Sequence, residues 1–146
     1  MHARKPIFPG IIELNFQSGE VIGCNVYLIY SGNEWVLVDI GYEENVDEFL
    51  EIIRDMDFPL SQCKGLIATH ADVDHVQGLA KLKQALRSPV YAHTNAVTPL
   101  ESGDKFVTLA EIPAQNLTLD MPAVKIDHVV DDGDVIQVGD IEIRVW

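Results

Sequence analysis

The stretch that most constrains the fold is Thr69-His70-Ala71-Asp72-Val73-Asp74-His75, in which four metal-capable side chains fall within six residues. An apolar run, Gly65-Leu66-Ile67-Ala68, precedes it, and a glycine and a helical pattern of leucines follow it. A buried strand, a loop and a helix in this order put the loop at the carboxyl end of a strand. Open α/β sheets bind ligands at that position. The stretch therefore predicts an α/β chain with a ligand site on this loop.

The side chains of the stretch are of the kinds that bind divalent metals, through imidazole nitrogen and carboxylate oxygen. In an extended loop His70, Asp72 and Asp74 point to one side, and a turn into the helix brings His75 back. This spacing suits two neighbouring metals, with His70 and Asp72 on one and Asp74 and His75 on the other. The alternative is a polar turn in which Asp74 caps a helix and the histidines are surface residues. Chemistry alone leaves both interpretations open.

The stretch resembles the T-H-x-H-x-D-H signature of the metallo-β-lactamase superfamily, which includes glyoxalase II and many hydrolases. His70, Asp74 and His75 match that pattern, whereas Asp72 stands where the family usually has histidine. Flavodiiron proteins, one branch of the family, are more similar here because they have a carboxylate at that position. Residues 25–41 resemble the first hairpin and the L-V-D-T-G turn of the family, and residues 132–140 resemble the hairpin before its third metal ligand.

The resemblance implies an α/β fold, the first half of an αββα sandwich, with a mixed sheet and helices on one face. At 146 residues the chain is expected to be a single domain spanning residues 1–146. The resemblance covers nearly the whole chain but only half of the family's fold, so the third metal-binding histidine would come after Trp146. By the family's order His93 and His128 precede that position, and we interpret both as structural or surface histidines.

The implied function is metal-dependent hydrolysis, in which a metal-bound hydroxide attacks an ester-, thioester-, lactone- or lactam-type bond of a small-molecule substrate. His70 and Asp72 would hold one ion, Asp74 and His75 the other, and Asp74 would also be the catalytic residue that orients the hydroxide. The expected cofactor is a divalent metal, zinc or iron with manganese as a further option, and up to two ions if the site is completed. A carboxylate at position 72 favours iron or manganese relative to zinc. Asp39, at a strand end, is expected to support the site without binding metal.

The ligand count leaves other functions open, because a catalytic zinc takes three protein ligands and the stretch offers two for each metal. A homodimer or a complementary C-terminal half would complete the site and would also cover the inner face of a lone half-sandwich. One alternative is a non-catalytic half-domain that folds or dimerises without activity. Another is a flavodiiron-like di-iron redox domain, which ranks lower because the chain shows no flavin-binding segment.

Composition narrows the partners and the compartment. A formal net charge of −13, from 23 acidic and 10 basic residues, argues against a nucleic-acid partner, which needs a basic face. Cys24 and Cys63 form no C-x-x-C pair, so we interpret both as small buried thiols in a reducing setting. The chain shows neither the apolar core of a signal peptide nor a stretch long enough to span a membrane. These observations predict a cytoplasmic location.

Hydrophobic periodicity predicts the order of the elements. Asn45, with Glu48 three residues on, is expected to cap the first helix, and residues 1–10, with His2, are expected to be an irregular lead-in. Residues 101–121 are predicted to be a loop with occasional extended pieces. Helices are predicted at 45–56 and 76–86, with one or two helical turns at 94–100. Strands are predicted at 11–16 (an edge strand), 21–30, 35–40, 64–69, 90–93, 124–130, 135–138 and 141–145.

Overall fold

The computed structural model describes residues 4–15 and 23–146. The predictions for His2 and for the ends of two strands at residues 16 and 21–22 lie outside the described residues. Among the described residues the main feature is a seven-stranded mixed sheet with the order β1-β2-β3-β4-β5-β6-β9. Its strands are β1 (Arg4–Phe8), β2 (Ile11–Asn15), β3 (Asn25–Ser31), β4 (Glu34–Val38), β5 (Cys63–Ala68), β6 (Val90–His93) and β9 (His128–Val130).

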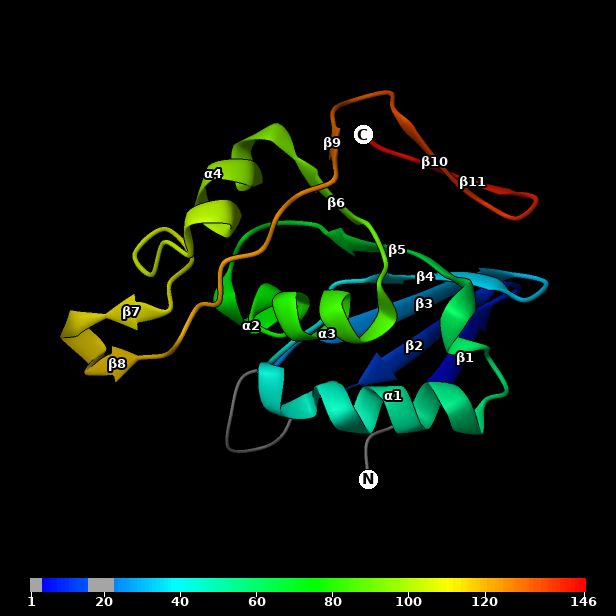
Figure 1. The fold of residues 1–146 in the computed structure, drawn as a ribbon, viewed down its shortest axis with the longest axis horizontal. Coiled ribbons are helices and arrows are strands. Elements are labelled where there is room, and N and C mark those ends of the chain that lie inside the picture. Colours follow the sequence, from blue (N-terminus) through cyan, green and yellow to red (C-terminus); the bar gives the residue numbers. More distant parts are fainter. Residues whose placement is uncertain (1–3, 16–22) are drawn as a thin grey trace.

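The pairing of the strands changes from antiparallel to parallel at β4. Strands β1 to β4 pair antiparallel, whereas β4, β5, β6 and β9 pair parallel. Helix α1 (Val46–Asp55) joins β4 to β5, and α2 (Val73–Val76) with α3 (Leu79–Leu86) joins β5 to β6. Figure 1 shows α1 and α3 beneath the same face of the sheet, while α4 (Thr94–Ser102) packs against β6 and β9. The predicted mixed sheet with covering helices is confirmed.

The register of the strands shows which face is the core. Directly paired residues share a face of a sheet, and one row of paired residues runs from β2 to β6. It consists of Ile12, Leu28, Leu37, Leu66 and Val90. The last four are 0% exposed, and they belong to one apolar cluster with the buried residues of α1, α2 and α3. This helix-covered face is therefore the main hydrophobic core.

The opposite face of the sheet is covered less completely. A second row of directly paired residues runs through six strands on this face. Its side chains are half-buried from β2 to β6 and exposed in β9. A hairpin of β10 (Val135–Val138) and β11 (Ile141–Arg144) lies over β3 and β4 on this side. Ile136 and Val138 of the hairpin and Val36 of β4 are buried outside the main cluster, so they form a second, small core. The row consists of Glu13, Tyr27, Val38, Ile67, Tyr91 and His128.

The hairpin is attached by its turn. The backbone N–H of Gly139 donates to Glu34 Oε2 at 2.7 Å, and that of Asp140 donates to Ser31 Oγ at 3.1 Å. Gly139 has a φ of +52°, and a Cβ there would lie 2.7 Å from the Cβ of Ser31. Glycine is required at this turn both for its backbone conformation and for the close approach.

Short elements complete the chain. A 3₁₀ turn, η1 (Glu43–Asn45), precedes α1, and another, η2 (Leu60–Gln62), precedes β5. The region predicted to be a loop contains β7 (Glu111–Ile112), η3 (Pro113–Gln115) and β8 (Leu117–Thr118), with β7 and β8 paired as a separate small sheet. The prediction of a loop with extended pieces therefore agrees with this region.

The N-terminal prediction was wrong. Residues 4–8 form β1 rather than an irregular lead-in, and this strand displaces β2 from the predicted edge of the sheet. Pro6 lies within β1, which only an edge strand tolerates because proline offers no N–H for a neighbouring strand. The prolines that suggested irregular chain are thus compatible with the outermost strand.

Three helix predictions also need correction. Asn45 makes no capping hydrogen bond through its side chain, because its backbone is already helical at the end of η1. The helix predicted from Val76 starts earlier: Asp72 is the residue before α2, Asp74 lies inside it, and α3 begins after Gly78. The helical turns predicted at 94–100 extend further, as α4 continues to Ser102 and stops at Gly103 in the left-handed conformation.

The strand predicted over 124–130 is shorter in the structure. Only residues 128–130 join the sheet, as β9. The N–H groups of Val124, Ile126 and Asp127 donate instead to Leu100 O, Glu101 Oε2 and Val90 O. These bonds fix the segment along α4 and β6, and they explain why an alternating pattern did not give a longer strand.

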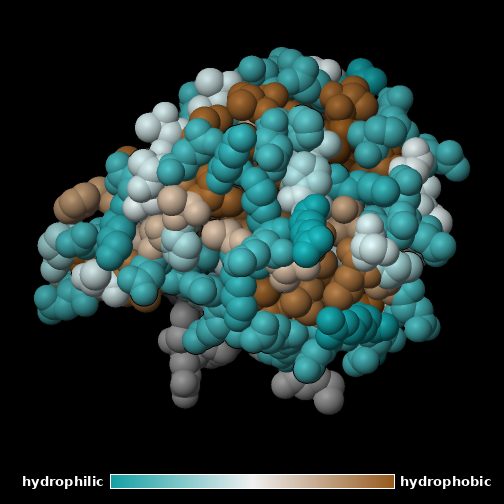
Figure 2. Space-filling model, in the orientation of Figure 1, coloured by the Kyte–Doolittle hydropathy of each residue, from teal (hydrophilic) through white to brown (hydrophobic). Residues whose placement is uncertain are grey.

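The face of the molecule seen in Figure 2 is largely polar, with apolar atoms visible between polar side chains. Within residues 4–15 and 23–146, every helix is too short or too polar to span a lipid bilayer.

Candidate metal centre

The four predicted ligands lie together at the carboxyl end of β5. His70 and Asp72 are on the loop after the strand, and Asp74 and His75 are in α2. His70 Nε2 is 3.5 Å from Asp72 Oδ2, and His75 Nε2 is 3.6 Å from Asp74 Oδ2. The two imidazole rings are 4.1 Å apart between centroids. The structure therefore groups these side chains as two adjacent pairs, His70 with Asp72 and Asp74 with His75.

The two pairs differ in exposure. The side chains of His70 and Asp72 are 43% and 45% exposed, whereas those of Asp74 and His75 are each 25% exposed. Asp72 precedes α2 but does not cap it with its side chain, so its carboxylate is left to face His70. The first pair is thus the open side of the centre and the second pair the sheltered side.

Asp39 lies behind the histidines, at the end of β4. Its carboxylate is almost fully buried and accepts hydrogen bonds from the Thr69 N–H at 3.0 Å and from His75 Nδ1 at 2.9 Å. The backbone of Asp39 is left-handed, with φ of +58°, a conformation that aspartate adopts more readily than most residues. A backbone N–H group and an imidazole thus both bind this buried carboxylate.

Thr69 links the two histidines through the same carboxylate. Its hydroxyl donates to Asp39, at 2.8 and 2.9 Å from the two oxygens, and lies 2.8 Å from His70 Nδ1. Because a hydroxyl has one proton and that proton is used for Asp39, we assign His70 Nδ1 as the donor to Thr69 Oγ. Both histidines then carry their proton on Nδ1 and present Nε2 toward the carboxylates. Sequence reasoning gave Thr69 no role, although it is the first residue of the motif.

One set of three candidate ligand atoms stands out among the described residues: Asp39, His70 and His75 offer atoms within 4.8 Å of one another. The carboxylate of Asp39 already accepts the three donors described above. A carboxylate that orients a metal-binding histidine through its other nitrogen is a common second layer of metal sites. We therefore interpret Asp39 as the residue that positions His75 and, through Thr69, His70.

Main-chain hydrogen bonds fix α2 independently of these side chains. The N–H groups of Ile40 and Gly41 donate to His75 O at 2.9 and 3.1 Å, and the Val73 N–H donates to Thr108 O at 2.7 Å. At the other end of α2, the Gly78 N–H donates to Gly41 O at 2.9 Å. The helix is thus held from the turn after β4 and from the loop after α4.

Gly78 allows this close packing. A Cβ at this position would lie 2.9 Å from Val46 Cγ2 and 3.1 Å from Tyr42 O. These distances are shorter than van der Waals contact, so the break between α2 and α3 requires glycine to reach the turn after β4.

Cys24 and Cys63 are both free and buried, as predicted. Burial raises the pKa of Cys24 to about 12, and the carboxylates of Asp39 and Asp74 add to this effect. Burial also raises the pKa of Cys63 to about 11, although a hydrogen bond from Ser88 opposes the shift. Both residues are neutral thiols at physiological pH, and thiolate is the form of cysteine that binds metal.

His93 and His128 have partners away from this centre. His93 Nδ1 accepts the Asn95 N–H at 3.1 Å, and its Nε2 is 3.2 Å from Asp131. His128 stacks on Tyr91 with 4.6 Å between ring centroids. Neither is in the three-residue set found among the described residues, which agrees with the structural interpretation of both.

Comparison with known proteins identifies the family. Residues 19–146 match the profile of the metallo-beta-lactamase superfamily. The chain belongs to this superfamily. It is also 31% identical, over 126 residues, to an uncharacterized protein of Aquifex aeolicus, an alignment that covers 85% of this chain and 53% of that protein.

Solved structures of metallo-β-lactamases share the fold. BJP-1 of Bradyrhizobium japonicum, a subclass B3 enzyme, is 24% identical with a TM-score of 0.74 over 92% of this chain and 47% of its own. MIM-1 from Novosphingobium pentaromativorans is 28% identical, with a TM-score of 0.70 over 82% of this chain and 43% of its own. A B3 enzyme described as having an active-site glutamic acid is 23% identical, with a TM-score of 0.78 over 97% of this chain and 50% of its own. The chain thus spans about half the length of the relatives it matches.

Proposed function

We propose that this chain carries half of the active site of a metal-dependent hydrolase that cleaves an ester-, thioester-, lactone- or lactam-type bond. In this proposal His70 and Asp72 bind one divalent metal, and Asp74 and His75 bind a second. The observation that carries the proposal is the pairing of two Nε2 atoms with two carboxylates at 3.5 and 3.6 Å, on a chain of the metallo-β-lactamase superfamily.

The donor geometry fits a metal ion in each pair. Two ligands that are each about 2.0–2.1 Å from one tetrahedral zinc ion lie about 3.4 Å apart. The measured separations of 3.5 and 3.6 Å are close to that value. The protonated Nδ1 atoms that we assign leave the Nε2 lone pairs free, and neutral imidazole is the form of histidine that binds metal.

The residues of the centre have distinct chemical roles in this proposal. Bound divalent metals would supply hydroxide at neutral pH and polarise the scissile carbonyl. Asp74, with its Oδ2 beside His75 Nε2, accepts a hydrogen bond from the attacking water and so orients it. Asp39 and Thr69 hold the two imidazoles, and the sheltered position of Asp74 and His75 limits competing solvent.

Asp72 would set the metal preference. A carboxylate in place of imidazole is a harder ligand and favours iron or manganese over zinc. A structural neighbour, the B3 enzyme described as having an active-site glutamic acid, supports the view that this fold accepts an acidic residue at its active site. We propose iron, manganese or zinc as the ion, in that order.

The ligand shell needs further residues, since a catalytic zinc takes three protein ligands. We propose that a complementary C-terminal half or a second copy of the chain supplies them by packing on the half-exposed face of the sheet. The apolar side chains of Val38, Ile67 and Tyr91 on that face support this arrangement. Light scattering that finds a stable monomer of the 146-residue chain would exclude the homodimer.

Metal content per chain tests the proposed site. Mass spectrometry of the purified protein should find bound metal, of which the ion shared by Asp74 and His75 is lost in Asp74→Ala and kept in Asp55→Ala, a control at an exposed position at the end of α1. The same three proteins should be assayed with aryl esters, thioesters, lactones and lactams. Equal metal in all three proteins would refute the role of Asp74.

A non-catalytic half-domain is the alternative that follows from the ligand count. It predicts a folded chain with neither metal nor activity in the unmodified protein. A di-iron redox domain predicts bound iron, oxygen consumption with a reductant and no hydrolysis. The metal measurement and the hydrolysis screen together separate these three functions.

We also propose a cytoplasmic location and a small-molecule substrate. The two buried free thiols suit a reducing compartment, and the net charge of −13 disfavours nucleic acid.

A further inference from the structure

A cavity of about 690 Å³ opens between η1, α2 and β8, on the helix that carries Asp74 and His75. Its size is within the range of small-molecule sites, about 300–1,000 Å³. Val73 and Gln77, four residues apart and therefore on one side of the helix, line the cavity. Val73 lies between Asp72 and Asp74, and consecutive Cα atoms are about 3.8 Å apart. None of the four proposed ligands lines the cavity, but Val73 joins it along the chain to Asp72 and Asp74.

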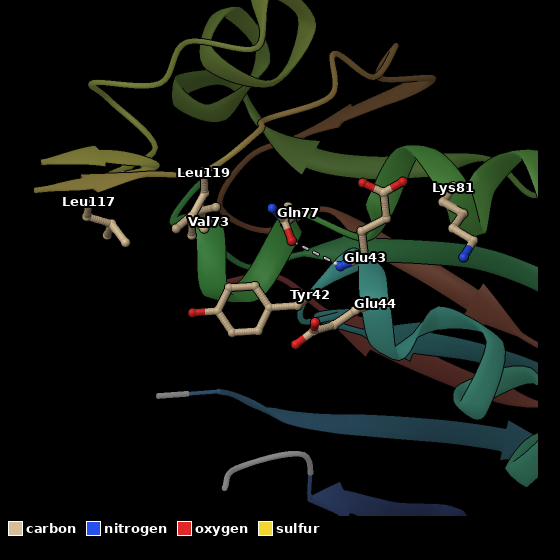
Figure 3. A pocket seen from close by; sticks show the side chains of 8 residues that line it. All are labelled: Tyr42, Glu43, Glu44, Val73, Gln77, Lys81, Leu117 and Leu119. Carbon is tan, nitrogen blue, oxygen red and sulfur yellow. Dashed lines mark hydrogen bonds between the residues drawn. The ribbon is translucent and has the colours of Figure 1, made fainter. Parts of the chain in front are cut away.

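The cavity has one apolar end and one charged end. Figure 3 shows Val73, Leu117 and Leu119 toward one end and Lys81 at the other, with Tyr42 between them. Tyr42 also lines the cavity, and burial together with the charge of Asp74 raises the pKa of Tyr42. A ligand that fills the apolar end would thus carry a hydrophobic group.

Gln77 joins the walls of the cavity. Its Oε1 accepts the Glu43 N–H at 3.1 Å, and its Nε2 donates to Asp120 O at 2.9 Å. These bonds tie α2 to η1 on one side and to the segment after β8 on the other. They use one N–H and one lone pair of the Gln77 amide, and the apolar end recognises ligands by shape and hydrophobicity.

The charged end disfavours anions. Glu43 and Glu44 line it together with Lys81, and the ammonium of Lys81 is 3.2 Å from Asp47 Oδ2. With Lys81 balanced by Asp47, the two glutamates leave a surplus of negative charge. Like charge repels an anionic group that enters the cavity.

The loop before β7 carries exposed apolar side chains. Phe106, Val107 and Leu109 are 64%, 57% and 47% exposed. Asp104 Oδ1 accepts the N–H groups of Phe106 and Val107, both at 2.9 Å, which orders the loop. The Thr108 carbonyl, within this loop, accepts the Val73 N–H. The exposed apolar side chains thus stand on a loop that is bonded directly to the start of α2.

We propose that this cavity binds an uncharged apolar substituent, alkyl or aryl, of the substrate whose scissile bond lies at the metal centre. Its identification as a substrate site rests on the proposed hydrolase function, whereas its preference for neutral apolar groups rests on the cavity alone. Substrates with an anionic group on that substituent are then poor ligands.

A matched pair of fluorescent probes tests the cavity without catalysis. N-phenyl-1-naphthylamine is neutral, and 1-anilinonaphthalene-8-sulfonate is the same aromatic system with a sulfonate. We expect saturable binding of the neutral probe that is at least tenfold tighter than that of the anionic probe. Leu117→Gln and Leu119→Gln should each weaken the neutral probe about tenfold, the loss expected from exposing part of a leucine side chain. Val135→Gln, at an exposed site on β10, should leave it unchanged.

The outcomes separate this inference from the proposed function. Asp74→Ala should lose metal and keep the neutral probe, because the lining residues do not include Asp74. If the protein catalyses metal-dependent hydrolysis but Leu117→Gln changes neither the binding of the probe nor the preference for longer acyl groups, the cavity assignment alone is overturned. Leu117 is half-buried and outside the main core, so its variant remains informative if Leu119→Gln unfolds. Equal binding of the two probes would also overturn the proposal.

Discussion

Removal of the Thr69 hydroxyl tests how the two histidines are oriented. Thr69→Val keeps the shape of the side chain and removes its contacts at 2.8 Å with His70 Nδ1 and at 2.8 and 2.9 Å with Asp39. The bond between His75 and Asp39 at 2.9 Å remains. The change should therefore weaken the metal held by His70 and Asp72 and leave the other one nearly unaffected.

The expected size follows from the number of ligands disturbed. Loss of a second-layer partner typically costs about 10–100-fold in metal affinity. In the pair of His70 and Asp72, only His70 loses its partner. We therefore expect a loss of metal affinity at the lower end of this range, about tenfold or about 1.4 kcal/mol. Thr69→Ser, which keeps the hydroxyl, should restore most of the affinity.

Competition of the purified protein with a chromophoric chelator for zinc measures both affinities. Thr98→Val, at an exposed position on α4, is the control for replacing a threonine by valine. Nitrogen NMR of the imidazole rings should show Nδ1 protonated in both histidines of the metal-free protein. Equal weakening of both metals, or no change in either, would refute the assigned relay from His70 through Thr69 to Asp39.

Two further predictions concern stability. Gly78→Ala should lower the free energy of unfolding by about 1–3 kcal/mol, because its Cβ would meet Val46 and the Tyr42 carbonyl; urea unfolding measures this, and a neutral result would refute the close packing. Stability should fall as pH rises above 9, the ordinary pKa of a thiol, toward the values of about 12 for Cys24 and about 11 for Cys63, because the folded chain retains protons that the unfolded chain loses. Unfolding midpoints at pH 8 and 10.5 should therefore diverge less in Cys24→Ala than in the unmodified protein.

Sequence patterns predicted the centre of the sheet better than its ends. Strands β3 to β6 are apolar runs between clear turns, and their burial on the helix-covered face leaves little choice of register. Strand β1, with Pro6, was missed because its assignment depends on its place at the edge, which local pattern does not report. Residues 124–127 alternate like a strand, but hydrogen bonds to α4 and β6 replace the ladder.

The residues of the candidate site also differ in whether the sequence alone could predict them. The four motif residues lie within six positions, so local spacing predicted their pairing. Asp39 and His75 are 36 residues apart in sequence, and only the parallel pairing of β4 with β5 brings them together. The cavity depends on Leu117 and Leu119, in the region with the weakest sequence pattern, so nothing local pointed to it.

The main-chain anchoring of α2 has an evolutionary consequence. Its position depends on the carbonyls of Gly41, His75 and Thr108, atoms that every residue type possesses. Side chains at positions 72 and 74 can therefore be exchanged without moving the helix on which the centre is built. A lineage with this scaffold can sample different metals, and with them different reactions, by single substitutions that leave the fold in place.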